Sequence, residues 1–123
     1  MSHGSFGWNE LMASDVEKAK SFYAKTLGWT VEEMKMPSGS YWIAKMGDKM
    51  VAGIMSNEMM PAGTPSHWFA YIEVDNVDQR CKSVAASGGK VVREPFDIPD
   101  VGRIAIISDA TGAMIGWMTP KPH

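Results

Sequence analysis

The sequence has few of the side chains that bind metals or link distant parts of a chain. It contains one cysteine, Cys81, and three histidines among 123 residues. A single cysteine excludes an internal disulfide bond, which is typical of proteins in a reducing cytosol. Cys81 falls in an apolar pattern with helical spacing, so we expect it to fill the core rather than act as a nucleophile. His3 and His123 lie near the chain ends, which leaves His67 inside the domain.

The sequence also lacks an excess of positive charge and any long apolar run. Twelve lysine and arginine residues stand against 14 aspartate and glutamate residues, which gives a net charge of -2. Without a basic stripe to neutralise phosphates, a nucleic-acid partner is not expected. No apolar stretch approaches the roughly 20 residues of a membrane span, and residues 1–7 do not resemble a signal peptide. We therefore expect a soluble, cytoplasmic protein with no membrane contact.

The chain repeats one pattern twice, with an offset of 61 residues. Asp15 corresponds to Asn76 at the start of a helical pattern, and Gly28 corresponds to Gly89 at its end. Each copy contains an apolar strand, a polar cap, a helix of about 12 residues, a glycine and further strands. Because 45% of the residues are apolar, one chain of this length can form a substantial core.

The predicted domain therefore consists of two modules within residues 1–123. Module one covers residues 6–55, a linker with two prolines covers 56–66, and module two covers 67–119. In module one, Ser14 to Glu17 reads as a capping box at the helix start. In module two, residues 94–102 contain two prolines and are predicted to form a loop. The order is β-α-β-β-β, twice, which places the chain in the α+β class.

Short stretches in both modules, taken in order, resemble the vicinal-oxygen-chelate superfamily of glyoxalases, bleomycin resistance proteins and extradiol dioxygenases. They are DVEKA at 15–19, FYAKTLGW at 22–29, VDNVD at 74–78, GGKVV at 88–92, GR at 102–103 and DATG at 109–112. The residues WNEL at 8–11 and the strand at 102–103 are most similar to a subgroup related to lactoylglutathione lyase. The resemblance implies that each module curls its four strands into half a barrel, giving a curved mixed sheet around a pocket. It also implies a homodimer, because small members commonly pair.

The resemblance further implies four metal-ligand positions, with His or Gln on each first strand and Glu on each last strand. In this sequence those positions fall on Trp8, Gly53, Phe69 and Gly116. Indole only donates a hydrogen bond, phenyl does neither, and glycine has no side chain. We therefore predict no protein-bound metal and no cofactor. His67 could point to the same face as Phe69, but one histidine without partner ligands makes a poor site.

Alternation along the first strands predicts which other side chains share the faces of Trp8 and Phe69. They are Glu10, Met12, Tyr71 and Glu73. Glu10 and Glu73 are the candidate catalytic residues, because two carboxyl groups in one site can serve as general acid and base. They could equally bind a cationic ligand, pair with a basic residue or reach solvent.

The remaining candidates concern the shape and chemistry of the ligand pocket. Aromatic rings at Trp8 and Phe69 suit planar or cationic ligands. Gly53 and Gly116 either leave space where carboxylates stand in relatives or mark close strand packing. The candidate ligand contacts from the sequence are Trp8, Met12, Trp42, Gly53, Phe69, Tyr71, Arg103 and Gly116.

Two of these contacts have an open alternative. Periodicity does not decide whether Tyr41 or Trp42 faces inward, and Arg103 could anchor either an anion or a loop. Three functions follow from the whole pattern. The first is a metal-free protein that binds an aromatic or amphipathic small molecule. The second is a metal-independent lyase or isomerase that uses Glu10 or Glu73, and the third is a glyoxalase-like lyase.

Overall fold

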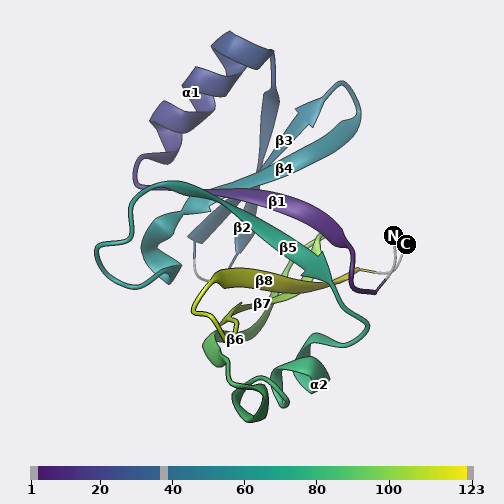
Figure 1. Ribbon diagram of the computed structural model, residues 1–123. Helices are drawn as coiled ribbons and strands as arrows, with labels where there is room; N and C mark the ends of the chain where they lie inside the picture. The colour runs from purple at the N-terminus through teal and green to yellow at the C-terminus, as the bar shows by residue number, and fades with distance from the viewer. Residues whose placement is uncertain (1–2, 37–38, 122–123) are drawn as a thin grey trace. The chain divides into compact units, whose positions relative to one another are not determined.

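The computed structural model describes residues 3–36 and 39–121, and the chain divides into two compact units (Figure 1). One unit is Asn9–Phe69, and the other combines Met1–Trp8 with Ala70–His123. We call them the Asn9–Phe69 unit and the Ala70–His123 unit. His123, which the sequence places at the chain end, lies outside the described residues.

The predicted order of strands and helices, β-α-β-β-β twice, is confirmed. The strands are β1 (Phe6–Ala13), β2 (Thr30–Met36), β3 (Gly39–Met46), β4 (Lys49–Ser56), β5 (His67–Glu73), β6 (Lys90–Ile98), β7 (Gly102–Ser108) and β8 (Met114–Pro120). The helices are α1 (Val16–Leu27) and α2 (Val77–Cys81), and two short 3-10 turns are η1 (Asn57–Met59) and η2 (Ala85–Ser87).

The strands of the Asn9–Phe69 unit lie in the order β2-β3-β4-β1. Strand β1 runs parallel to β4, and the other two pairings are antiparallel. Helix α1 covers one face of this sheet, where Leu11, Ala13 and Ile54 form a buried cluster. Because side chains alternate along a strand, the residues between these positions face away from α1.

Helix α1 begins one residue later than the predicted capping box. Asp15 is the N-cap, and its carboxylate accepts a hydrogen bond from the backbone N–H of Lys18 at 3.0 Å. Ser14 instead donates its backbone N–H to the Ser66 hydroxyl. Aspartate and serine both cap helices well, so the sequence alone does not distinguish the two neighbouring positions. Gly28 ends the helix with a φ of 77°, as the pattern predicts.

The strands of the Ala70–His123 unit lie in the order β5-β8-β7-β6. Strand β5 runs parallel to β8, and β7 pairs antiparallel with both β6 and β8. The core on the α2 side consists of Val74, Val77, Cys81, Val84, Ala105 and Ile107. Cys81 is buried there, in agreement with its predicted role as a core residue, and burial raises the pKa of its thiol.

Helix α2 is much shorter than the predicted 12 residues. It ends at Cys81, and the chain continues through a turn into η2. The Ser83 hydroxyl donates to the backbone carbonyl of Arg80, a local bond that competes with the regular helix. Val84 is nevertheless buried, as its apolar spacing predicts, although its segment is irregular.

Strand β6 is longer than predicted and continues to Ile98 through most of the expected loop. Its pairing with β7 shifts between Val91 and Arg93 and again between Arg93 and Phe96. Pro95 lies within the second shift, and β6 is at the end of the strand order. A proline is tolerated at an irregular position of an edge strand, because its missing N–H interrupts no regular ladder.

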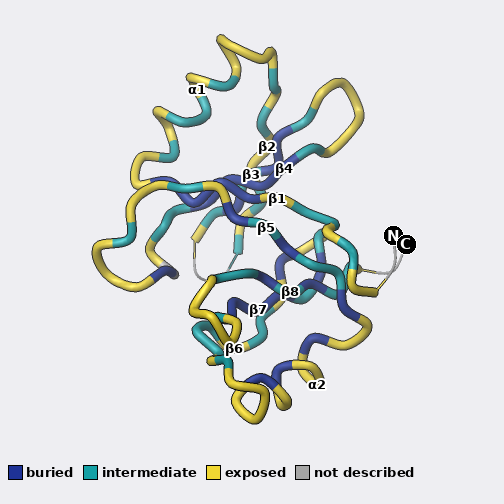
Figure 2. Tube along the Cα trace, in the orientation of Figure 1, coloured by how far each residue is buried: buried dark blue, intermediate teal, exposed yellow. Residues whose placement is uncertain are grey.

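The buried residues lie mainly on the strands, whereas α1 has no fully buried residue (Figure 2). Across residues 3–36 and 39–121, neither helix has the length and apolar character needed to cross a membrane.

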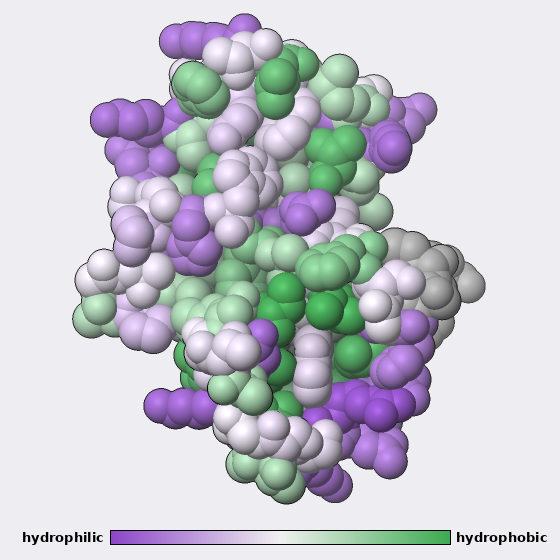
Figure 3. Space-filling view, in the orientation of Figure 1, coloured by the Kyte–Doolittle hydropathy of each residue, from purple (hydrophilic) through white to green (hydrophobic). Residues whose placement is uncertain are grey.

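The ion pair at the start of α2 should make stability depend on pH. Hydrophilic side chains gather over α2 (Figure 3), and Arg80 donates two hydrogen bonds to the Asp75 carboxylate at 2.8 and 2.9 Å. These bonds lower the pKa of Asp75 from 3.8 to about 2. A carboxyl group whose pKa is lower in the folded state contributes stability above its unfolded pKa, and this contribution is lost as pH falls through the folded value.

We expect Asp75→Asn to be less stable than the natural sequence at about pH 5, with a difference that shrinks as pH approaches about 2. Urea unfolding at several pH values measures this difference. A difference that stays constant over the range would contradict the role of the ion pair.

Candidate functional site

The face of the Asn9–Phe69 sheet that points away from α1 carries one acid among apolar side chains. Strand register places Glu10 opposite Gly53, Gly53 opposite Ile43, and Met12 opposite Met55. We call this surface the acid face, and its residues are Glu10, Met12, Tyr41, Ile43, Gly53 and Met55. All six are buried. The predicted neighbours Glu10 and Met12 therefore share one face.

Glu10 is the one charged residue that is fully buried within the described part of the chain, with 0% exposure. Met12 and Tyr41 are also 0% exposed. Moving a carboxyl group out of water costs free energy unless other groups compensate for the lost hydration. Ligand sites commonly combine mostly apolar walls with a few such polar groups, which fix the orientation of the ligand. The acid face has this composition.

Tyr41, rather than Trp42, shares the face of Glu10. Trp42 lies on the opposite side of the sheet and packs against the cluster beneath α1. The Lys20 ammonium lies 3.5 Å from the centre of its ring, in a cation–π contact. The expectation that Trp42 lines the pocket is therefore corrected in favour of Tyr41, because the strand register leaves only one of the two neighbours on each face.

Gly53 leaves no space on the acid face. A methyl group at Gly53 would overlap the hydroxyl and ring of Tyr41. Gly116 has the same relation to Tyr71, whose ring lies directly against it in the Ala70–His123 unit. Of the two sequence interpretations, close packing is confirmed and vacant space is wrong, since a tyrosine ring occupies the room beside each glycine.

The second predicted acid has a different environment. Tyr71 and Glu73 alternate on β5 and share a face with Gly116 and Met118, away from α2. Tyr71 is fully buried, whereas Glu73 is only half-buried. Glu10 and Glu73 belong to different units.

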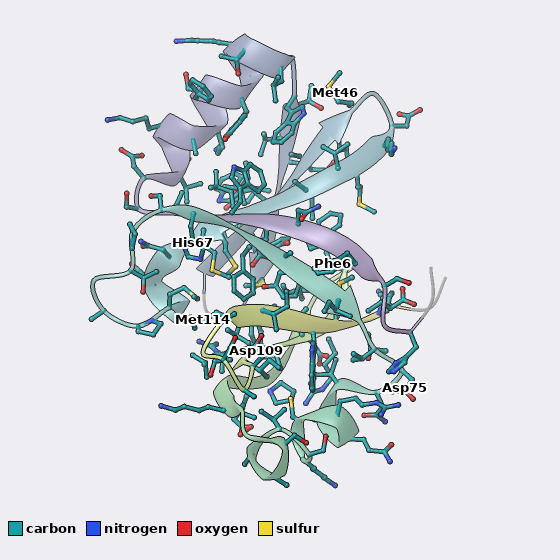
Figure 4. The ribbon with its side chains drawn as sticks, in the orientation of Figure 1. Phe6, Met46, His67, Asp75, Asp109 and Met114 are labelled. Atoms are coloured by element: carbon teal, nitrogen blue, oxygen red, sulfur yellow. The ribbon has the colours of Figure 1, made fainter. Side chains whose placement is uncertain are left out.

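The aromatic residues that replace the expected metal ligands are also divided between the units. Trp8 is half-buried and belongs to the Ala70–His123 unit, whereas Phe69 is 4% exposed and belongs to the Asn9–Phe69 unit. His67 lies 6.0 Å from Phe69 between ring centres, edge to face, and its Nδ1 is 2.8 Å from the carbonyl oxygen of Pro65 (Figure 4).

Arg103 anchors α2 and β6 instead of presenting a free positive charge. Its guanidinium donates two hydrogen bonds to Asp78 on α2, at 2.7 and 3.0 Å, and one to Asp97 on β6 at 3.2 Å. These bonds raise the pKa of Arg103 and lower the pKa of Asp78. Arg103 alternates with the buried Ile104 and lies on the other face of the sheet from Tyr71. These contacts favour the anchoring role that the sequence left open for Arg103.

The side chains at the four expected ligand positions do not fit a divalent metal. Trp8 and Phe69 offer no lone pair that could bind an ion, and tyrosine rings fill the room beside Gly53 and Gly116. Within residues 3–36 and 39–121, no three His, Cys, Asp or Glu side chains are grouped closely enough to hold one ion. We therefore derive no chemical step through a metal.

Sequence reasoning missed Ile43 and Met55 as parts of the acid face. Both lie on strands whose alternation is visible in the sequence, but only the register with β1 places them beside Glu10 and Met12. The signal that could have identified them is the pairing of β1 with β4, which the repeat alone does not specify.

Comparisons with known proteins identify the family. The model of the Glyoxalase/Bleomycin resistance protein/Dioxygenase superfamily matches residues 5–116. A Mycobacterium bovis protein named "Putative glyoxylase CFP32" is 40% identical over 121 residues, which are 98% of this chain and 46% of that protein. The Streptomyces peucetius "Anthracycline biosynthesis protein DnrV" is 28% identical over 89% of this chain and 45% of that protein. The chain thus spans less than half the length of these curated relatives.

Solved structures show the same fold at low sequence identity. Methylmalonyl-CoA epimerase from Mycobacterium tuberculosis has a TM-score of 0.67 at 17% identity, with coverage of 99% of this chain and 94% of that chain. A Streptomyces coelicolor methylmalonyl-CoA epimerase has a TM-score of 0.69 at 15% identity, with coverage of 98% and 100%. Because the family model matches residues 5–116, which are most of the chain, the chain belongs to the Glyoxalase/Bleomycin resistance protein/Dioxygenase superfamily.

Proposed function

We propose that this protein binds an aromatic or amphipathic small molecule without a metal ion. The observation that carries the proposal is the fully buried carboxyl group of Glu10 on the otherwise apolar acid face. An apolar ligand surface would contact Met12 and Tyr41, and a cationic or hydrogen-bonding group of the ligand would meet Glu10. Phe69, which belongs to the same unit, would supply a further aromatic contact.

Aromatic side chains at the ligand positions support the metal-free part of the proposal. Trp8 and Phe69 would replace a site for a hydrated ion with a site for a ring. The relative named for anthracycline biosynthesis suggests an aromatic compound as one chemical class. Since the chain covers less than half of that relative, its activity is not transferred to this protein as a whole.

A metal-independent lyase or isomerase is the second candidate. A carboxyl group held in a buried, apolar site can act as a general acid or base, and Glu10 has this environment. Glu73 is the weaker candidate, because its partial exposure gives it a more water-like setting. A glyoxalase-like lyase that requires a protein-bound metal is the least supported function, because the expected donor atoms are absent at Trp8, Gly53, Phe69 and Gly116.

The setting of this function is also a proposal. We propose a cytoplasmic homodimer with no cofactor, on the basis of the family resemblance and the lone buried Cys81. Size-exclusion chromatography with light scattering measures the dimer directly.

A thermal-shift screen tests the proposed function. We expect 9-aminoacridine, a planar aromatic cation, to raise the melting temperature by roughly 5 °C at saturating concentration, because a ligand that binds only the folded state stabilises it. The neutral 1-naphthol should give a smaller shift, and 1-naphthoate the smallest, because its charge repels Glu10. EDTA should change none of these shifts.

Two results would contradict the proposal. One is a large stabilisation by a divalent cation alone that EDTA reverses, which would restore the metal-dependent alternative. The other is the absence of a shift with all three aromatic compounds. Turnover of a substrate without added metal would instead favour the lyase or isomerase, and loss of that turnover in Glu10→Gln would place the chemistry at this acid.

A further inference from the structure

A hollow lies on the α2 side of the Ala70–His123 sheet, away from the face of Tyr71. Its volume is about 310 Å³, and it is bounded by the segment after α2 and by the ends of β7 and β8. Residues at its wall and rim include Ser83, Val84, Ser87, Ile107, Asp109 and Trp117. Figure 4 labels Asp109 at the turn between β7 and β8, which borders this hollow.

The shortness of α2 accounts for the hollow. In the Asn9–Phe69 unit, 12 residues of α1 lie over the sheet, whereas α2 ends after five residues. The following turn and η2 bring Ser83 and Ser87 to the rim, in place of a continuous helix over Trp117. An uncovered strip of the sheet therefore remains beside the core cluster.

The rim is held in place by close backbone packing. A Cβ atom at Gly89 would lie 2.6 Å from the carbonyl oxygen of Ser108 and 3.0 Å from a Val84 methyl group. A Cβ atom at the neighbouring Gly88 would touch Ala110 at 3.4 Å. Only a residue without a side chain lets the segment after η2 approach the end of β7 so closely. The hollow therefore has a defined shape before any ligand enters.

The walls and the rim differ in chemistry. Val84, Ile107 and the half-buried Trp117 give an apolar floor with one aromatic surface. Ser83 and Ser87 bring hydroxyl-bearing side chains to the rim. The Ser83 hydroxyl already donates to the Arg80 carbonyl, so its oxygen is left to accept a hydrogen bond from a ligand.

Asp109 gives the rim a fixed negative charge. Its Oδ1 atom accepts hydrogen bonds from the Thr111 backbone and hydroxyl and from the Ala113 backbone, at 2.8, 2.6 and 3.1 Å. These bonds lower the pKa of Asp109 and hold its side chain in the turn. The Gly112 backbone also bonds to this carboxylate. An ionised carboxylate has two oxygens with about four acceptor positions, so it can accept a further hydrogen bond from a ligand. None of the described residues that line the hollow is a lysine or arginine, so an anionic ligand would find no cationic partner there and would be repelled by Asp109.

We propose that this hollow binds a neutral hydroxylated ring of the size of one pyranose sugar. One face of such a ring carries C–H groups that would stack on Trp117, and its hydroxyl groups would exchange hydrogen bonds with Ser83, Ser87 and Asp109. The site lies on the opposite face of the sheet from Tyr71 and Gly116, so it is separate from the site of the proposed function. Its occupancy does not depend on Glu10.

Nuclear magnetic resonance titration of the full chain with methyl β-glucoside tests the proposal. We expect shifts in the Trp117 indole and the Ser87 and Asp109 amide signals, with small shifts on the acid face. The Ser87→Ala variant removes one hydroxyl at an exposed position and should weaken binding about fivefold. Trp117→Phe should weaken it further while keeping an aromatic ring, and Glu10→Gln should leave it unchanged.

Two comparison ligands complete the experiment. Glucuronate should bind more weakly than the glucoside because of its charge, and tetramethylammonium should not displace the glucoside. Absence of glucoside shifts at Trp117, equal binding by Ser87→Ala, or binding of tetramethylammonium in place of the sugar would overturn the proposal. Failure of the aromatic screen at Glu10 has no effect on these signals, so the two sites are tested separately.

Discussion

Replacing Gly116 with alanine is expected to lower the free energy of unfolding by about 1–3 kcal/mol, the usual cost of overpacking a core. The added methyl group would overlap the ring of Tyr71, which is fully buried and lies opposite Gly116 where β5 pairs with β8. A stable domain has only about 5–15 kcal/mol in total, so this loss is large. Gly53→Ala should have a similar effect through Tyr41. Urea unfolding monitored by circular dichroism gives both values.

A double-mutant cycle separates the overlap from other effects of alanine. In a Tyr71→Leu background the Gly116→Ala substitution should cost much less, because the smaller side chain leaves room for the methyl group. Gly53→Ala should retain its full cost in the same background, which makes it the matched control. If Gly116→Ala costs the same with either residue at position 71, the ring does not determine the choice of glycine.

Replacing Glu10 with glutamine should weaken the binding of the cationic aromatic ligand by about 10- to 100-fold. The substitution keeps the size of the side chain and removes its charge, and a hydrogen bond to a charged group contributes about 1.5–3 kcal/mol. Glu10 is fully buried. In the variant, water would therefore not reach the ligand cation to replace its lost interaction with the carboxylate. Isothermal titration calorimetry with 9-aminoacridine measures the change.

The controls for Glu10 use acids in other settings. Glu58→Gln removes an exposed carboxylate from the same unit and should leave the affinity within about twofold. Glu73→Gln tests the second predicted acid on its own sheet. Unchanged affinity in Glu10→Gln, combined with a large loss in Glu73→Gln, would contradict the role proposed for the acid face. It would indicate that Glu73 on β5 binds the polar group of the ligand.

The sequence predicts the architecture because the same pattern of strands and helix occurs in both modules. Gly28 ends α1 and Gly88, beside the predicted Gly89, ends η2, and alternation along β1 places Glu10 and Met12 together correctly. The length of α2 is not predicted, because the apolar positions Val77, Cys81 and Val84 fit a regular helix as well as the irregular segment that forms. The backbone N–H groups of Ser83 and Val84 bond three residues back instead of four, and the spacing of apolar residues does not predict this change.

The candidate site is only partly predictable, because pairing between strands determines it. Tyr41 and Trp42 alternate equally well in the sequence, and only the register of β3 with β4 and β1 assigns Tyr41 to Glu10. Glycine is likewise required at positions 53 and 116 because each contacts a tyrosine ring that is distant in the sequence. The ion pair of Arg103 is also not predictable from the sequence, since its partner Asp78 lies 25 positions away on another element.

The compact units exchange the beginnings of their first strands. Residues 3–8 belong with module two, where the backbone of Gly4 and Ser5 bonds to Glu73 at 2.7 Å in both directions. The corresponding residues of β5, up to Phe69, belong with module one. A cut between residues 57 and 66 would therefore separate the polypeptide into two pieces without separating the folded units. Each piece would carry a short segment that packs in the unit formed mainly by the other piece, so we expect neither piece to fold fully without the other.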